Sequence, residues 1–144
     1  NERLAKNLVR DGEGATKLLE CTVTGAKDLD TAIIVAKSVI CSPLFKCAMF
    51  GADANWGRIL CAVGYAEADF DINKVDVSLS SKAGEIHVCH NGAGIEFSEE
   101  VAKTVLLEDE ITISVSIGDG NGTATAWGCD LTYDYVKING DYRS

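Results

Sequence analysis

The sequence predicts an α+β fold, a two-layer sandwich in which a mixed β-sheet packs against helices. Helical and alternating apolar patterns are interspersed along the 144 residues, and two pairs of predicted strands are separated by short turn segments, as in hairpins. No long linker, internal repeat or low-complexity segment interrupts these patterns. We therefore expect a single domain over residues 1–144, with residues 1–10 as a leading helix.

The N-terminal part of the chain alternates between helix and strand. Apolar residues at helical spacing predict a helix over residues 1–10, and strict alternation predicts a strand over residues 17–24. Asp28 is a good N-cap for a second helix over residues 29–41. Pro43 should end that helix, because the residue before a proline disfavours the helical conformation.

The segment 50–66 predicts a central helix, preceded by a short strand over residues 45–49. Asp53 and Asn55 are good N-caps for this helix, whose bulky and small residues form separate faces. The bulky face holds Trp56, Ile59, Leu60 and Val63, and the small face holds Gly57, Cys61 and Gly64. Because a glycine inside a helix costs about 1 kcal/mol relative to alanine, we expect another backbone to pack closely on the small face. The helix would then be buried on two sides, and Gly64→Leu would destabilise the fold by overpacking.

The next part of the chain predicts a hairpin and then a helix. Residues 74–80 and 85–90 alternate as two strands joined by a short loop. Ser98 is followed by Glu99 and Glu100, and acidic residues are favourable in the first turn of a helix.

The C-terminal part predicts a second hairpin and an ordered tail. Residues 110–117 alternate without a break, and the glycine-rich segment 118–122 is typical of a tight turn that returns the chain as a partner strand over residues 123–131. The apolar residues of segment 132–138 should dock on the body of the protein, whereas residues 139–144 are polar and should be mobile.

Composition excludes several classes of protein. The formal charge of −9 and the pI near 4.6 argue against nucleic-acid binding, which needs lysine and arginine. No apolar run reaches the roughly 18 residues of a membrane span, and no targeting segment is present.

The six cysteines form no CxxC motif, so we expect free thiols and a cytoplasmic location. Because residue 1 is asparagine, we expect a fragment or a processed product.

Two clusters suggest metal ligands, but we favour a structural interpretation of both. On a strand, His87 and Cys89 would share one face and His90 the other, and no second cluster completes a zinc site. Asp119 and Asn121 lack the ligand spacing of a calcium loop, so a hairpin turn is the better interpretation. We therefore expect no metal site.

The segment 11–16 is a stronger candidate for binding. Two glycines flank a single carboxylate, Glu13, directly after the leading helix. A solvated turn is the simpler interpretation. Glycines also permit close approach of the backbone to a ligand, and a fixed carboxylate could bind an amine.

Four separated motifs together resemble the ornithine acetyltransferase family, the bifunctional glutamate N-acetyltransferases of arginine biosynthesis. The motifs are residues 9–17 (VRDGEGATK), 42–44 (SPL), 55–59 (NWGRI) and 135–143 (YVKINGDYR). The similarity runs along essentially the whole chain and implies the C-terminal part of the family's β chain, that is, the C-terminal domain of a self-processing acetyltransferase.

This resemblance implies a specific activity. Family members cut themselves before a threonine, which becomes the nucleophile that carries acetyl from N-acetylornithine to glutamate, and some members also accept acetyl-CoA. The implied substrate-binding residues are Glu13, Asn139 and Ser144, with no catalytic residue in this chain and no cofactor other than acetyl-CoA as a substrate. The implied partners are the α chain of the same precursor and further copies of the heterodimer.

The chain also departs from the family pattern. Lys17 follows Ala15-Thr16, so this pair is not the cleavage site. Gly140 replaces a usual alanine, and Ser144 replaces a threonine but keeps the hydroxyl. The chain therefore holds part of the pocket and lacks the nucleophile, so alone it should be inactive. The alternative is a stand-alone binding or assembly domain of the same fold, which the coding sequence upstream would distinguish.

Overall fold

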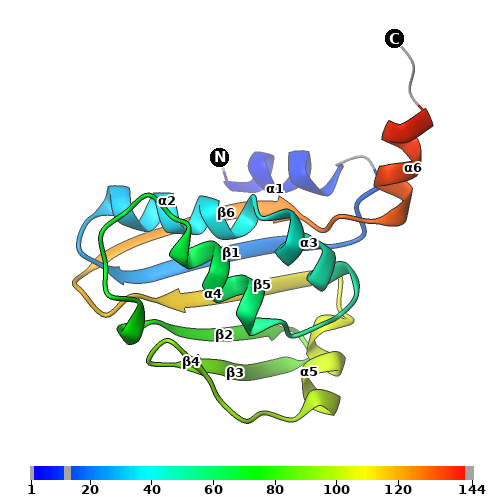
Figure 1. The fold of residues 1–144 in the computed structure, drawn as a ribbon. Helices are drawn as coiled ribbons and strands as arrows, with labels where there is room; N and C mark the ends of the chain where they lie inside the picture. The colour runs from blue at the N-terminus through cyan, green and yellow to red at the C-terminus, as the bar shows by residue number, and fades with distance from the viewer. Residues whose placement is uncertain (1, 12–13, 142–144) are drawn as a thin grey trace.

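The computed structural model describes residues 2–11 and 14–141, and in this part of the chain helices and strands are interspersed as predicted (Figure 1). The elements in chain order are α1 (Glu2–Arg10), β1 (Leu18–Ala26), α2 (Leu29–Ile40), α3 (Pro43–Phe50), α4 (Trp56–Gly64), a 3-10 turn (Ile72–Lys74), β2 (Asp76–Ser81), β3 (Gly84–His90), β4 (Ala93–Gly94), α5 (Glu99–Leu106), β5 (Glu110–Ser116), β6 (Gly122–Cys129) and α6 (Tyr133–Asp141).

The strands form one mixed sheet in the order β4-β3-β2-β5-β1-β6. Strand β1 is parallel to β5 and antiparallel to β6, whereas β2 is antiparallel to both β3 and β5. Helices α2, α3 and α4 lie over one face of the sheet (Figure 1). The core forms between these layers, because alternate apolar residues of β1, β2 and β5 are buried. The predicted α+β sandwich is confirmed.

The predicted hairpin between residues 110–117 and 123–131 is wrong, because β1 lies between these two strands. The segment after β5 bonds to the end of β1: Ile117 N donates to Thr24 O at 3.0 Å, and Gly120 N donates to Gly25 O at 2.9 Å. The glycine-rich turn therefore carries the chain across β1 to its far edge. The hairpin of β2 and β3 forms as predicted.

The predicted short strand over residues 45–49 is also wrong, because this segment is helix α3. Ser42 is its N-cap and accepts a hydrogen bond from Phe45 N at 3.3 Å, and Pro43 occupies the first turn. Proline is favourable at that position because its missing N–H has no partner in a helix. Pro43 thus ends α2 and also begins α3.

The predicted burial of α4 on two sides is wrong on the side of its small residues. Ile59 and Val63 are fully buried, but Gly57, Cys61 and Gly64 are exposed. A Cβ added at Gly64 would meet nothing within 4 Å. The small face is therefore open, and in its first turns it lines a cavity that is described below.

Gly64→Ala is expected to stabilise the fold by up to about 1 kcal/mol, because alanine has the higher helix propensity and meets no neighbour. Gly122→Ala is the contrasting variant, since its Cβ would lie 2.4 Å from Asp28 O. We expect it to destabilise the fold by about 1–3 kcal/mol through overpacking. Thermal melts of both variants test this, and a lower melting temperature for Gly64→Ala would contradict the open face.

The C-terminal segment is helical but does not dock as predicted. Tyr133 is 82% exposed, and Val136 and Ile138 are also exposed. The start of α6 is held by an edge-to-face contact between the rings of Phe50 and Tyr133, with centroids 5.3 Å apart. Of the tail expected to be mobile, residues 139–141 are helical, and residues 142–144 lie outside the described part of the chain.

No single helix in the described residues is long and apolar enough to cross a membrane. Helices α2 and α3 would reach the required length only together, across a bend of 57°. Both helices bury apolar residues in the core, so packing against the sheet explains their composition.

Candidate functional site

The four sequence motifs come together in two pairs. The end of the first motif, residues 14–17, contacts the segment from Asp130 to Tyr135, where the fourth motif begins. The second and third motifs meet where α4 passes the start of α3. The first pair carries Glu13 and Asn139, two of the three residues predicted to bind substrate.

Asp130 fixes the end of the glycine loop. Its side chain is buried, and Oδ1 accepts hydrogen bonds from Thr16 N at 2.8 Å and from Lys17 N at 2.9 Å. The other carboxylate oxygen accepts a hydrogen bond from the Thr16 hydroxyl. One buried carboxylate therefore satisfies three donors, and hydrogen bonds to a charged acceptor are among the stronger ones in proteins.

Thr132 joins the glycine loop to α6. Its hydroxyl donates to Gly14 O at 2.5 Å and accepts from Tyr135 N at 3.0 Å, so it also acts as the cap of α6. Gly14 has a φ of +71°, and a Cβ there would lie 2.6 Å from Tyr135 N. Only glycine allows this conformation together with so close an approach.

Lys17 ties the same region to two helices. Its Nζ donates to Met49 O at 2.6 Å, near the end of α3, and to Leu106 O at 2.7 Å, the last residue of α5. A cation is favourable at helix C-termini. Burial lowers the pKa of Lys17, and the nearby Asp130 carboxylate opposes this shift. The start of β1 is thereby held to both helices.

Of the three predicted substrate-binding residues, Glu13 and Ser144 lie outside the described residues. Asn139 is exposed on α6, where its Nδ2 donates to Tyr135 O at 2.8 Å, one turn earlier. Tyr135 in turn lies against Gly14. The structure thus brings the end of the predicted binding loop to the helix that carries Asn139.

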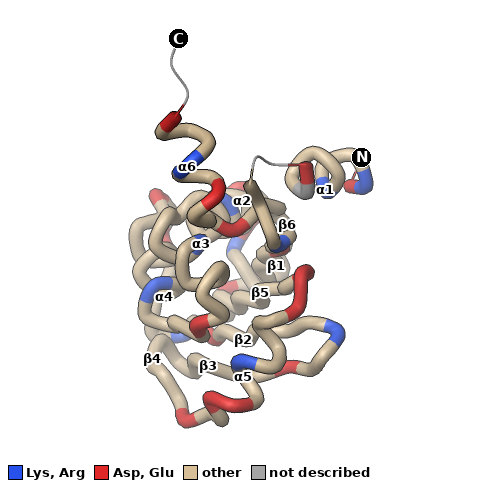
Figure 2. Tube along the Cα trace, turned by 90° about the vertical axis from the view of Figure 1, so that its right-hand side faces the viewer, with Lys and Arg blue, Asp and Glu red and all other residues tan. Residues whose placement is uncertain are grey.

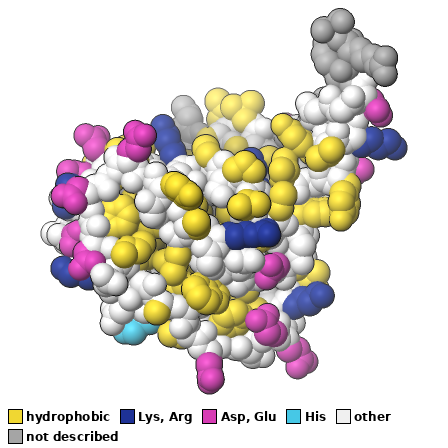
Figure 3. All heavy atoms as spheres, in the orientation of Figure 1, with side chains coloured by type: hydrophobic (Ala, Val, Ile, Leu, Met, Phe, Trp, Pro, Cys, Tyr) yellow, Lys and Arg dark blue, Asp and Glu magenta, His cyan; other side chains and the backbone are white. Residues whose placement is uncertain are grey.

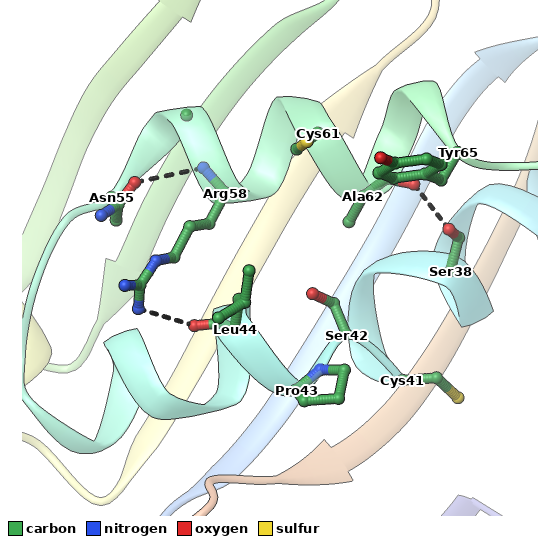
Figure 4. A pocket seen from close by; sticks show the side chains of 11 residues that line it. Ser38, Cys41, Ser42, Pro43, Leu44, Asn55, Arg58, Cys61, Ala62 and Tyr65 are labelled. Carbon is green, nitrogen blue, oxygen red and sulfur yellow. Dashed lines mark hydrogen bonds between the residues drawn. The ribbon is translucent and has the colours of Figure 1, made fainter.

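The second pair of motifs lines a cavity of about 570 Å³ (Figure 4). Its walls are the end of α2, the start of α3 and the outer side of α4. Arg58 Nη1 donates to Leu44 O at 3.0 Å, which links the two motifs, and Asn55 Oδ1 caps α4 by accepting from Arg58 N. Hydrophobic side chains gather over α3 and α4 in the space-filling view (Figure 3).

The electrostatics of this cavity favour neutral or anionic occupants. Among the described residues that line it, only Arg58 is charged. Among the described residues no carboxylate forms an ion pair with Arg58. Elsewhere, basic and acidic residues are interspersed rather than segregated (Figure 2).

The predicted geometry of the His87–His90 segment is corrected by a β-bulge. Val77 pairs with Cys89, but Ser78 pairs with His87, so Val88 is the additional residue. Cys89 is consequently buried beside Val88, while His87 and His90 are exposed on the other side. Residues 2–11 and 14–141 contain no group of three His, Cys, Asp or Glu side chains placed to hold a metal ion.

Burial makes two of the cysteine thiols poor nucleophiles. Burial raises the pKa of Cys21 to about 12 and that of Cys89 to about 11, so both thiols stay protonated at neutral pH. His90 contacts Asp76, with Nδ1 2.9 Å from Oδ1, and His87 contacts Glu85. The six cysteines are all free.

Sequence reasoning missed Asp130 and Thr132. A local signal existed for Thr132, because threonine is a common N-cap and Tyr133 and Val136 follow at helical spacing. Asp130 gave no such signal, since its partners Thr16 and Lys17 lie more than a hundred residues away.

Comparisons with known proteins agree with this arrangement. A profile of the ArgJ family matches residues 1–144. The arginine biosynthesis bifunctional protein ArgJ of Caldanaerobacter subterraneus subsp. tengcongensis is 56% identical over 144 residues, which are 100% of this chain and 36% of that protein. A glutamate N-acetyltransferase of Methanosarcina mazei is 46% identical over 98% of this chain and 36% of its own length.

The fold agrees as well. The crystal structure of the arginine biosynthesis bifunctional protein argJ from Bacillus halodurans superposes with a TM-score of 0.91 at 49% identity, covering 98% of this chain and 65% of that one. The present chain therefore spans about a third of the length of the curated relatives. The profile match and these identities lead to one conclusion: the chain belongs to the ArgJ family.

Proposed function

We propose that this chain is the C-terminal part of a glutamate N-acetyltransferase that moves an acetyl group from N-acetylornithine to glutamate. In this proposal the complete protein cleaves itself in the cytoplasm, and the threonine exposed by cleavage, outside this chain, is the nucleophile. Its hydroxyl attacks the acetyl carbonyl, the amine of ornithine leaves with a proton, and an acetyl ester remains. The amine of glutamate then attacks the ester and restores the threonine. Acetyl-CoA could supply the same acetyl group, with its thiol as the leaving group.

Within this reaction the chain would bind the amino-acid parts of the substrates. A carboxylate at Glu13 would accept hydrogen bonds from a substrate ammonium group, which suits both ornithine and glutamate. Asn139 and Ser144 would contribute further hydrogen bonds. The α chain and the start of the β chain would complete the pocket, and holding both substrates near the nucleophile would lower the entropic part of the barrier.

The observation that carries this proposal is the double hydrogen bond of Thr132. It ties Gly14, at the end of the predicted binding loop, to Tyr135, one helical turn before Asn139. Two motifs separated by more than a hundred residues thus meet at one place, as a shared binding site requires. In the alternative, a stand-alone assembly domain, the same contacts would serve only to hold the fold together.

Acetyl transfer by the complete protein tests the proposal. Wild-type protein should form N-acetylglutamate from N-acetylornithine, and this chain alone should not. Deleting residues 141–144 should lower kcat/KM at least tenfold, because a buried hydrogen bond to substrate is lost, while the melting temperature stays nearly unchanged. Lys137→Ala, exposed on the same helix, is the control and should keep full activity. Full activity of the truncated enzyme would remove Ser144 from the site.

A further inference from the structure

We propose that the cavity between α2, α3 and α4 binds a small amphipathic carboxylate, that is, an organic acid with a hydrocarbon chain or ring. Its carboxylate would pair with Arg58, and its hydrocarbon part would lie on the apolar walls. The cavity is built largely from the second and third sequence motifs, to which the proposed function gives no role. The proposal therefore does not depend on acetyl transfer.

The cavity has the size and the lining of a small-molecule site. Its volume of about 570 Å³ lies within the range of about 300–1,000 Å³ that is typical of ligand pockets. Most of its lining surface is apolar and includes Pro43, Leu44 and Ala62 (Figure 4). Leu44 and Tyr65 are 62% and 80% exposed, so this lining is open to solvent. Covering it with a hydrocarbon group removes apolar surface from water, which favours binding.

Arg58 supplies the charge that selects an anion. A guanidinium group carries five N–H donors, and among the described residues only Leu44 O accepts from that of Arg58, at 3.0 Å from Nη1. A carboxylate can accept two parallel hydrogen bonds from such a group. One cation in an otherwise uncharged lining matches one negative charge, so a monocarboxylate suits the cavity better than a polyphosphate does.

Two further polar side chains of the lining are occupied within the protein. Ser38 Oγ donates to Ala62 O at 2.5 Å. Asn55 accepts from Arg58 N through Oδ1 and donates to Asp53 Oδ2 through Nδ2. These bonds hold α4 against α2 and fix the start of α4, so the walls are in place before a ligand arrives. The guanidinium group is then the main polar contact, and the rest of the ligand should be hydrocarbon.

Gly57 brings the backbone of α4 to the cavity wall. A Cβ added at Gly57 would meet only Asn55 Oδ1, at 3.5 Å, which is an ordinary contact. Packing within the described residues therefore does not require glycine here, although alanine is more favourable inside a helix. A bound ligand gives a reason for glycine, because the absence of a side chain lets the ligand approach the backbone closely.

The experiment measures binding of sodium octanoate to the complete protein by isothermal titration calorimetry. Two probes with the same hydrocarbon chain are compared with it: octan-1-ol, which is neutral, and octylammonium, which is positively charged. We expect saturable binding of octanoate, with an affinity that falls as the ionic strength rises, because Arg58 is partly exposed. Octan-1-ol should bind more weakly, and octylammonium should bind most weakly of the three.

Arg58→Gln tests the proposed charge pair. It should raise the Kd for octanoate about tenfold, because hydrogen bonds between two charged groups are lost, and it should leave the Kd for octan-1-ol unchanged. Lys37→Gln is the matched control. It removes a positive charge from an exposed position of α2, next to Ser38 in sequence but outside the lining, and should keep wild-type affinity.

Gly57→Leu and Gly64→Leu test the location without changing the charge. Both positions lie on α4 with space for a side chain, but only Gly57 lines the cavity. Gly57→Leu should weaken binding of octanoate and of octan-1-ol about tenfold or more, because the added side chain competes for the same space. Gly64→Leu should bind both probes like wild type. Thermal melts should show that both variants remain folded.

Two results would overturn the inference: octanoate fails to bind the complete protein, or octanoate and octylammonium bind equally well. Unchanged octanoate affinity in either Arg58→Gln or Gly57→Leu would overturn it too. Weaker binding in both of these variants and wild-type affinity in both controls would support it. None of these measurements requires acetyl transfer, so a failure of the proposed function is distinguishable from a failure of this inference.

Discussion

Phe45→Ala is expected to lower the free energy of unfolding by about 3–5 kcal/mol, the largest stability effect that we predict for a single residue. Phe45 has no exposed surface, and it is the largest of the fully buried side chains among the described residues. It lies on α3, so its removal leaves a cavity between the helices and the sheet. Urea denaturation of this chain measures the change.

The neighbouring residue provides the control for this variant. Leu44 is 62% exposed on the same helix, and only its backbone carbonyl bonds to Arg58. Leu44→Ala should therefore change the free energy of unfolding by less than about 0.5 kcal/mol. Equal destabilisation by the two variants would mean that α3 is not packed as described.

Glu13→Gln should lower kcat/KM for acetyl transfer by about ten- to a hundredfold in the complete enzyme. This follows from the proposed bond between the Glu13 carboxylate and a substrate ammonium group, because a hydrogen bond to a charged group contributes about 1.5–3 kcal/mol. Steady-state kinetics with both the acetyl donor and the acceptor measure the effect, and self-cleavage should be unaffected.

Asp11→Asn is the matched control, since it makes the same change from acid to amide two residues earlier, at an exposed position. It should leave kcat/KM within about twofold of wild type. If Glu13→Gln and Asp11→Asn have the same kinetics as wild type, Glu13 is not in the site.

Local signals predicted most helices and one hairpin correctly. Asp28, Asn55 and Ser98 each cap the helix that the sequence assigned to them, and each accepts a hydrogen bond from the backbone three residues later. The hairpin of β2 and β3 also depends only on neighbouring residues. In these cases the interactions that decide the structure lie within one short segment.

Non-local interactions explain the wrong predictions. Nothing in residues 110–131 indicates that β1 separates β5 from β6, because that arrangement depends on Leu18–Ala26. A Cβ at Gly64 on the small face of α4 would meet nothing within 4 Å, and sequence spacing cannot distinguish such an open face from a closely packed one.

The residues of the candidate site also divide into those with a local sequence signal and those that depend on non-local contacts. Motif similarity identified Glu13, Asn139 and Ser144, whereas the contacts of Asp130 with Thr16 and Lys17 and the bond of Thr132 to Gly14 span more than a hundred residues. Only the helix-capping role of Thr132 had a local signal. A buried carboxylate and a buried hydroxyl have no periodic pattern in sequence. Their function is visible only when their partners in the glycine loop are known.

The position of β1 in the sheet has a consequence for the folding kinetics. Leu18 pairs with Glu110 on one side and with Cys129 on the other. During synthesis, β1 therefore has no hydrogen-bonding partner on either edge until β5 and β6, near the end of this chain, have been made. Helices α2 and α3 and the β2–β3 hairpin can form earlier. Such long-range pairing is expected to slow folding, because the entropy of closing the long loops is lost before the strand contacts form. Until β5 and β6 pair with it, the apolar strand β1 exposes unpaired backbone N–H and C=O groups. The ribosome-bound chain is then most vulnerable to aggregation.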